Sequence, residues 1–258
     1  MLKRFFTHPL TSNLDLDDPR TTVLRRQIIK EQRLLREIYE EWYHDIAASI
    51  PQGPGAVLEL GSGPGFMKEY IPDLLTSELF YCPGVDVVLN GTQLPIGDQA
   101  LRAIVMTDVL HHIPEIRRFF AQASRCIYPG GVVVMIEPWV TTWSRLIYKN
   151  LHHEPFEPDA RDWEFPLAGP LSSANGALPW ILFKRDCEQF EYEFPEWQLK
   201  SIKGRMPFRY LVSGGVSMRS PMPGWTSGLW RGIEGLLTPW VDSLAMFALI
   251  VLQKKRNV

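Results

Sequence analysis

The chain has 258 residues, of which 45% are hydrophobic, and its formal net charge at pH 7 is −2. This length suits one large domain with an elaboration, and the hydrophobic content argues against a disordered chain. The nearly balanced charge gives no reason to expect nucleic acid as a partner.

Residues 1–50 are expected to form an N-terminal helical extension. Between residues 20 and 49, apolar side chains recur at helical spacing with charges between them, which predicts one or two helices. Such helices either pack on the sheet that follows or form a lid over a cofactor, and the spacing suits both. A breaker cluster at residues 51–55 ends the extension.

After the breaker cluster, strand and helix patterns alternate. Apolar runs predict strands at 56–60, 85–89, 101–106, 132–136, 190–203 and 244–252, and helices at about 65–75 and 116–127. This alternation predicts an α/β fold with a doubly wound, mostly parallel sheet.

The most informative stretch is residues 56–65, AVLELGSGPG. Gly61, Gly63 and Gly65 follow the first predicted strand, and glycine lets backbone N–H groups approach a ligand closely. In an open α/β sheet, ligands bind at such a turn, under the N-terminus of the next helix. A dinucleotide fingerprint would need glycine where Phe66 stands, so a nicotinamide-dependent oxidoreductase is the weaker alternative.

Three later segments extend this pattern: LPIGD at 94–98, IVMTDVLHHI at 104–113 and RCIYPGGVVVMIE at 125–137. In this order and spacing, the four motifs resemble class I S-adenosylmethionine-dependent methyltransferases of the small-molecule type, such as methyltransferase domain 11. The resemblance implies a Rossmann-like sheet of seven strands with an antiparallel last strand. It also implies S-adenosylmethionine as cofactor and S-adenosylhomocysteine as product. Residues 51–258 would be the methyltransferase domain, with substrate-side insertions at about 140–187 and 204–243.

The resemblance also implies cofactor-binding positions along these motifs. Glu59 is expected to bind the amino group of the cofactor, directly or through water. Asn90 would accept from the adenine amino group where the family usually has aspartate, although Asn90 and Gly91 would also suit a plain turn. The other positions expected at the cofactor are Gly61, Ser62, Gly63, Gly65, Gly91 and Thr107.

An acid after the second strand is needed to accept hydrogen bonds from the ribose hydroxyls. Two residues compete for this role, Glu78 and Asp86. Glu78 is favoured because Asp86 lies only four residues before Asn90, too few for a crossover to the third strand.

Methyl transfer is an in-line displacement that depends mainly on alignment and exclusion of water, and a base helps where the acceptor must lose a proton. His111 and His153 are the candidate bases, although His111 and its neighbour His112 also suit a structural role. No metal is expected, because adjacent histidines do not share a helical face.

The second half of the chain is rich in tryptophan and loop residues. Such an apolar insertion suits a small apolar, aromatic or lipid-like methyl acceptor, and it suits a homodimer interface equally well. A non-catalytic cofactor-binding protein on the same fold is the alternative function.

Three scattered cysteines without metal-type spacing fit a reducing, cytoplasmic compartment. No transmembrane segment is expected, because the longest apolar run, residues 244–252, is about half of a membrane span.

Overall fold

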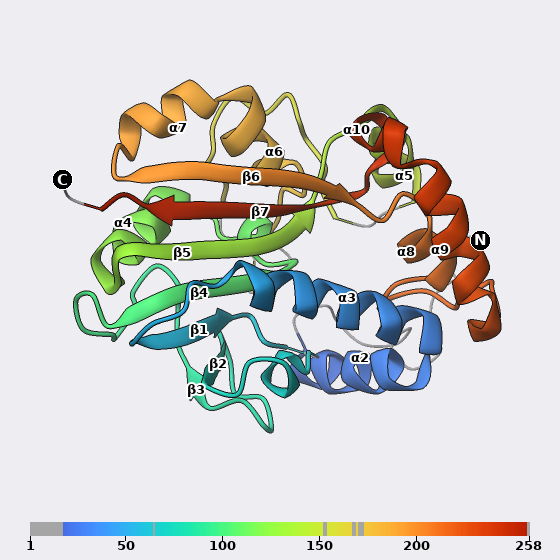
Figure 1. Ribbon diagram of the computed structural model, residues 1–258, viewed down its shortest axis with the longest axis horizontal. Coiled ribbons are helices and arrows are strands. Elements are labelled where there is room, and N and C mark those ends of the chain that lie inside the picture. Colours follow the sequence, from blue (N-terminus) through green and yellow to red (C-terminus); the bar gives the residue numbers. More distant parts are fainter. Residues whose placement is uncertain (1–17, 64, 152–153, 167–168, 170–172, 257–258) are drawn as a thin grey trace.

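The computed structural model describes residues 18–63, 65–151, 154–166, 169 and 173–256. These residues contain one seven-stranded sheet with the strand order β3-β2-β1-β4-β5-β7-β6 (Figure 1). Strand β7 is antiparallel to both of its neighbours, and the other pairs are parallel. The predicted fold class, a doubly wound and mostly parallel sheet with an antiparallel last strand, is confirmed.

The elements have the following bounds. The strands are β1 (Ala56–Leu60), β2 (Leu74–Glu78), β3 (Val87–Val88), β4 (Leu101–Thr107), β5 (Ile127–Pro138), β6 (Trp197–Arg205) and β7 (Phe247–Lys254). The helices are α2 (Pro19–Glu31), α3 (Arg33–Ser49), α4 (Ile116–Cys126), α5 (Thr142–Leu151), α6 (Leu178–Trp180), α7 (Cys187–Glu193), α8 (Arg209–Ser213), α9 (Ser227–Leu236) and α10 (Val241–Leu244). Short 3₁₀ or π turns are η1 (Met67–Glu69), η2 (Leu110–His112), η3 (Ile181–Arg185), η4 (Gly224–Thr226) and η5 (Thr238–Trp240).

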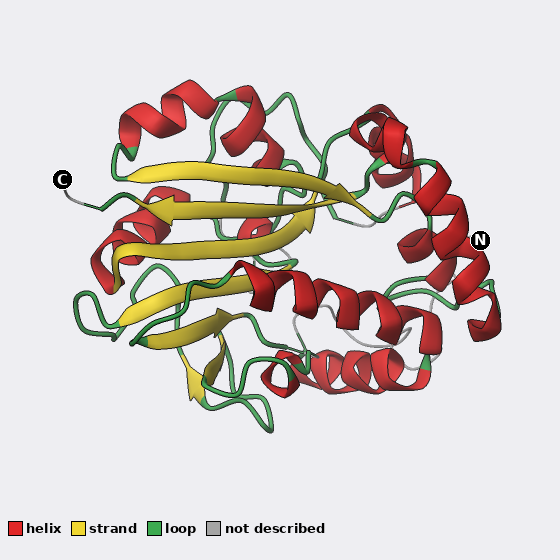
Figure 2. Cartoon of the chain, in the orientation of Figure 1, coloured by secondary structure: helices red, strands yellow, loops and turns green. Residues whose placement is uncertain are grey.

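Alternate side chains of the central strands enter two separate cores, as the two-residue period of a strand requires. On one face, Leu58, Ile104 and Val133 pack with α4, η3 and α7. On the other face, Val57 and Val105 pack with α2, α3 and α5. The sheet is therefore a middle layer with helices packed on both faces. Figure 2 shows the helices, the strands and the loops that connect them.

The N-terminal extension consists of two helices, as expected. Helix α3 buries Leu35, Ile38, Trp42 and Ile46 against the sheet, so it is part of the core. Helix α2 also contributes Thr22 and Arg25, together with Tyr39 of α3, to the lining of a cavity of about 390 Å³. Helix α2 therefore both packs in the core, through Ile28 and Ile29, and lines the cavity. Closure of α2 as a lid remains a prediction.

The expected helix at 65–75 is wrong. The crossover from β1 to β2 contains only the single turn η1. Pro72 removes a backbone donor and disfavours helical geometry at the preceding residue. Helix α3 occupies this face, where Tyr43 lies edge-on against Phe66 with ring centroids 5.0 Å apart. The glycine turn consequently lacks a helix N-terminus above it, and its own N–H groups must serve a ligand.

Three other boundaries differ from the sequence expectation. Residues 187–193 form α7, so β6 begins at Trp197 and not at 190. Strand β7 begins at Phe247, because residues 241–244 form α10. Strand β5 begins at Ile127, since the Pro129-Gly130-Gly131 segment continues the strand.

The tryptophan-rich insertion is attached to α3 by a charge network. Arg209 of α8 is 6% exposed and binds Glu41 of α3 through two N–O contacts of 2.6 and 2.7 Å. The same guanidinium binds Glu234 of α9 at 2.6 Å. Arg231 also reaches Glu41, but its side chain is 57% exposed. Arg209 thus joins three helices at the end of the sheet toward which the parallel strands point (Figure 1).

The same insertion exposes large apolar side chains along and around α9. The residues exposed by 37–79% are Met222, Trp225, Leu229, Leu236 and Trp240. These side chains are not part of either core, so the predicted homodimer interface remains a prediction. Among the described helices, none has the length and apolar character needed to cross a bilayer.

We expect Arg209→Met to lower the free energy of unfolding by about 3 kcal/mol, because the change leaves two carboxylates without their buried cation. Arg231→Met is the matched control and should cost less than about 1 kcal/mol, since an exposed ion pair contributes little. Urea denaturation of both variants measures the difference. Equal losses would show that burial of Arg209 does not decide the attachment of the insertion.

Candidate active site

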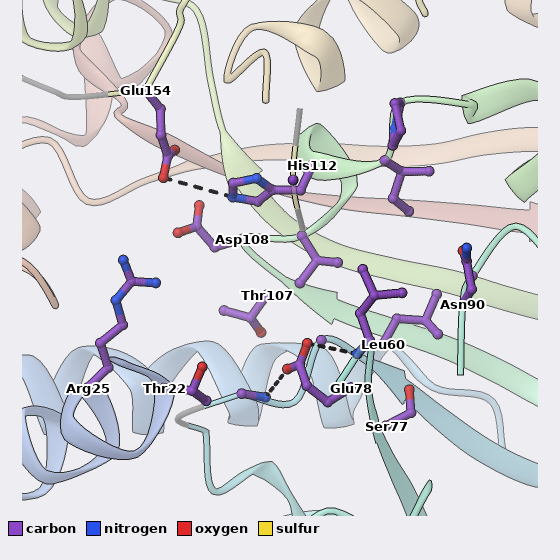
Figure 3. A pocket seen from close by; sticks show the side chains of 18 of the residues that line it. Thr22, Arg25, Leu60, Ser77, Glu78, Asn90, Thr107, Asp108, His112 and Glu154 are labelled. Atoms are coloured by element: carbon purple, nitrogen blue, oxygen red, sulfur yellow. Dashed lines mark hydrogen bonds and ion pairs between the residues drawn. The ribbon is translucent and has the colours of Figure 1, made fainter. Parts of the chain in front are cut away.

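A cavity of about 390 Å³ lies at the carboxyl ends of β1, β2 and β4, where open α/β sheets bind ligands. At one end it is lined by the glycine turn, Glu78 and the segment 89–92. At the other end it is lined by Asp108, His112, Glu154 and side chains of the insertion. Figure 3 shows Thr107 between these two groups, with Arg25 of α2 to one side. We refer to these parts as the cofactor end and the acceptor end, after the roles that the sequence predicts for them.

The glycine turn has the backbone geometry that its sequence predicts. Gly61 has φ +62°, and a Cβ there would lie 2.6 Å from Val109. Gly63 has φ +38° and donates its backbone N–H to Oε2 of Glu78 at 2.9 Å. Both conformations favour glycine, and both residues line the cavity.

Glu78 stands at the last position of β2, so the acid favoured from the sequence lies at the carboxyl end of the second strand. Its carboxylate accepts from Gly63 and from its own neighbour Leu79, at 2.9 and 3.0 Å (Figure 3). Burial raises the pKa of Glu78, while these two backbone hydrogen bonds oppose the rise. A carboxylate has about four acceptor positions, so Glu78 can accept further hydrogen bonds from a ligand in the cavity.

Asp86 has a structural role on the other side of β2. Its carboxylate binds Lys68 and accepts from the backbone N–H and hydroxyl of Thr76, at 2.7–2.9 Å. The Lys68 ammonium and the Thr76 donors lower the pKa of Asp86 to about 2. Asp86 does not line the main cavity, which agrees with the choice of Glu78.

Three of the expected cofactor residues lie behind the glycine turn. Glu59, Ser62 and Gly65 line a separate cavity of about 160 Å³ and not the main one. The Glu59 side chain is almost fully buried, and this burial raises its pKa to about 7 although a hydrogen bond with Ser62 opposes the rise. Direct contact of Glu59 with a ligand in the main cavity therefore remains a prediction.

Asn90 and Gly91 line the cofactor end. However, Oδ1 of Asn90 already accepts from the N–H and the hydroxyl of Thr92, both at 2.9 Å. This is an Asx turn, the alternative considered from the sequence. To recognise an adenine amino group, this oxygen would have to exchange one of the Thr92 hydrogen bonds.

Thr107, at the end of β4, has a buried hydroxyl without a hydrogen-bond partner among the described residues. Buried polar groups are rarely left unpaired, and Thr107 lines the cavity between its two ends. The unpaired hydroxyl, the glycine turn and Glu78 together fit a ligand that has both hydrogen-bond donors and acceptors. The cavity volume lies within the usual range for such sites.

The acceptor end holds an acidic and imidazole cluster. Asp108 follows β4 with φ +62°, a conformation that aspartate tolerates better than most residues. Burial raises the pKa of Asp108 to about 7, although the charge of His111 opposes this. His112 donates from Nδ1 to the carbonyl of Ser173 at 2.9 Å, and Nε2 lies 3.9 Å from Glu154. Burial, and then the charge of His111, lowers the pKa of His112 to about 4.

His111 is fully buried and lies behind the cavity wall. Its Nδ1 binds Glu137 at 2.8 Å, and its Nε2 lies 3.5 Å from Glu154. Burial alone would lower the pKa of His111, but the two carboxylates raise it well above its usual value. A general base must reach the substrate and must be unprotonated, so this geometry does not suit the predicted catalytic role of His111.

The other predicted base, His153, lies outside the described residues. Five further residues that line the cavity were not predicted from the sequence as site residues: Arg25, Tyr39, Glu154, Tyr210 and Val216. These residues come from the N-terminal helices and from the insertions. The only signal for them in the sequence was the expectation that the insertions lie on the substrate side.

A mostly parallel α/β sheet with a cavity at the carboxyl ends of its strands is typical of proteins that bind a nucleotide-like ligand. The sequence profile of the family described as "Methyltransferase domain" matches residues 31–178. The chain belongs to this family and is a class I S-adenosylmethionine-dependent methyltransferase.

Among curated proteins, the chain is similar to the phthiotriol/phenolphthiotriol dimycocerosates methyltransferases of Mycobacterium tuberculosis and Mycobacterium bovis. The identity is 28%, over 34% of this chain and 40% of the relatives. The chain thus matches less than half of the length of these relatives.

Among solved structures, the geranyl diphosphate C-methyltransferase of Streptomyces coelicolor A3(2), crystallised with Mg²⁺, geranyl diphosphate and S-adenosylhomocysteine, is similar over 96% of this chain and 91% of that chain. Its identity is 13% and its TM-score is 0.51. At this identity the likeness shows the shared fold alone.

The raised pKa of Glu59 predicts how stability depends on pH. In the unfolded chain Glu59 ionises near pH 4.5, whereas in the folded protein it keeps its proton until about pH 7. The extra proton bound by the folded state stabilises the fold. This stabilisation is fully present below pH 4.5 and is lost as the pH rises through 7. We expect the free energy of unfolding of Glu59→Gln, relative to the parent, to increase by about 3 kcal/mol between pH 4.5 and pH 8.

Denaturation at both pH values, with the exposed Glu69→Gln as control, measures this change. A constant difference between Glu59→Gln and the parent would show that folding does not raise the pKa of Glu59.

Proposed function

We propose that the protein transfers the methyl group of S-adenosylmethionine to a small apolar, aromatic or lipid-like molecule. The observation that carries this proposal is the continuous cavity, in which the glycine turn and Glu78 lie at one end and a mixed polar and apolar acceptor end lies at the other. Thr107, with its unpaired hydroxyl, lies between them.

The residues at the cofactor end have distinct roles in this proposal. Glu78 accepts hydrogen bonds from the ribose hydroxyls, because both of its oxygens keep acceptor capacity beyond Gly63 and Leu79. Gly61 and Gly63 let the backbone approach the methionine part. Asn90 and Gly91 contact the adenine, and Glu59 acts on the amino group from behind the turn, with Ser62 and Gly65.

The acceptor end supports an apolar substrate. Tyr210, Val216 and Ser217 line both the main cavity and a neighbouring cavity of about 70 Å³. That smaller cavity is otherwise mainly apolar, with Ile147 and Met246 in its lining. The mycobacterial relatives are named for lipid-like substrates, which agrees with an apolar acceptor.

The main role of the protein in this reaction is to position the two reactants. S-adenosylmethionine, when bound, supplies a methyl group on a positively charged sulfur. The chain aligns the acceptor with that methyl group, at about 3–3.5 Å, and excludes water. Tyr39, Phe165 and Tyr210 supply apolar wall, and Arg25 and His112 supply polar contacts. His153 remains a predicted base.

We expect Glu78→Ala to weaken binding of S-adenosylhomocysteine by about 1–3 kcal/mol, because the ribose contacts are lost. Asp86→Asn is the control and should leave this affinity within about twofold, since Asp86 lies outside the main cavity. Isothermal titration calorimetry measures both. Loss of affinity in Asp86→Asn with normal affinity in Glu78→Ala would reverse the two roles.

We expect Val216→Trp to reduce methyl transfer at least about tenfold while S-adenosylhomocysteine still binds, because the larger side chain fills the acceptor end. Leu229→Trp, at an exposed position of α9, is the control. The assay follows a labelled methyl group from S-adenosylmethionine into a mixture of apolar hydroxy compounds, lipids and water-soluble amines, whose products are separated by organic extraction. Label that enters only water-soluble amines would overturn the apolar acceptor class, and failure of the parent to bind the cofactor would overturn the function.

A further inference from the structure

Two adjacent histidines and a glutamate converge behind and beside the acceptor end. Nε2 of His111 lies 3.5 Å from Oε2 of Glu154, and Nε2 of His112 lies 3.9 Å from Oε1 of the same carboxylate. One ligand atom from each of the three residues lies within 4.8 Å of the others. The sequence argument against a metal assumed an α-helical separation of the two histidines. In the 3₁₀ turn η2 their ring centroids are instead only 4.2 Å apart.

Both imidazole rings are held through their Nδ1 atoms. Nδ1 of His111 bonds to the carboxylate of Glu137, and Nδ1 of His112 bonds to the carbonyl of Ser173, at 2.8 and 2.9 Å. A carbonyl oxygen only accepts, so Nδ1 of His112 carries a proton. Metal-binding histidines are typically held in this way, with one nitrogen bonded to a carboxylate or carbonyl and the other directed at the ion.

A separate observation also points to a ligand. Nε2 of His111 is fully buried and makes no hydrogen bond to any residue that the structure describes. It faces Glu154 at 3.5 Å, beyond the usual hydrogen-bond range. Around a tetrahedral ion with bonds of about 2.1 Å, ligand atoms are about 3.4 Å apart. The separation between Nε2 of His111 and Glu154 is already close to this value, and since the three ligand atoms lie within 4.8 Å of one another, side-chain adjustment would bring the set around one ion.

A second group, Asp108, His111 and Glu137, also has its ligand atoms close together. However, Oε1 of Glu137 accepts from the backbone N–H groups of Val109 and Leu110, at 2.9 and 2.7 Å, and Oε2 binds His111. Because Glu137 is engaged through both oxygens, the group around Glu154 is the better donor set.

We propose that Nε2 of His111, Nε2 of His112 and a carboxylate oxygen of Glu154 bind a divalent first-row transition-metal ion such as Zn²⁺, with release of the Nε2 proton of His111 to solvent. Two imidazoles and one carboxylate suit such ions, whereas Mg²⁺ prefers oxygen ligands. His112 and Glu154 line the cavity, so the open coordination positions face the acceptor end. A hydroxyl or carboxylate oxygen of the methyl acceptor would complete the coordination of the ion. Only this last point rests on the proposed function.

The test uses the full chain without an affinity tag, stripped with chelator and titrated with Zn²⁺ in the absence of cofactor. Calorimetry should show one equivalent bound at micromolar affinity or better, with Mg²⁺ unable to compete. His112→Gln and Glu154→Gln should each weaken binding by at least about tenfold. His44→Gln, at an exposed position of α3, is the matched control and should bind as the parent does.

Each variant is also titrated with S-adenosylhomocysteine. Retained cofactor affinity shows that the variant is folded, and it separates failure of the metal site from failure of the proposed function. X-ray absorption at the zinc edge of the loaded parent gives a second readout, with nitrogen and oxygen neighbours expected at about 2.0–2.2 Å. Absence of saturable binding, undiminished binding in both variants, or sulfur neighbours from the cysteines would each overturn the proposal.

Discussion

The hydrogen bond from the backbone of Gly63 to Glu78 is the contact on which the candidate site depends. It joins the turn after β1 to the end of the neighbouring strand β2. The turn needs this support because the crossover that follows is a single 3₁₀ turn and offers no helix N-terminus. One side chain thereby fixes the loop and presents its remaining acceptor positions to the cavity.

Glu137 performs the equivalent task on the other side of β4. It lies at the end of β5 and accepts two backbone N–H groups from the segment that begins η2. The same carboxylate orients His111. The glycine turn and η2 are thus both held by buried carboxylates, and Val109 of the second loop lies directly against Gly61 of the first. The two ends of the cavity are for this reason parts of one packed structure.

Much of the fold and of the cofactor end could be predicted because the signals are local. The glycines after β1 and the acid ending β2 depend on spacing within some twenty residues. The acceptor end could not be predicted in this way. His112 meets Ser173, 61 positions away, and Glu154 enters from the segment after α5. Such pairs follow from tertiary packing, which hydrophobic periodicity does not encode.

The missing crossover helix also explains why the N-terminal extension is integral to the enzyme. Without that helix, Val57 of β1, Met67 of η1 and Leu74 of β2 have no helical cover from the crossover itself, and they share one apolar cluster with residues of α3. A Cβ at Gly65 would lie only 2.6 Å from the hydroxyl of Tyr43 in α3, so this helix also favours glycine in the turn. Helix α2 directly precedes α3 in the chain, and its residues Thr22 and Arg25 line the cavity. The position of α3 in the core therefore also places part of the cavity wall. The extension therefore links the stability of the sheet to the shape of the site.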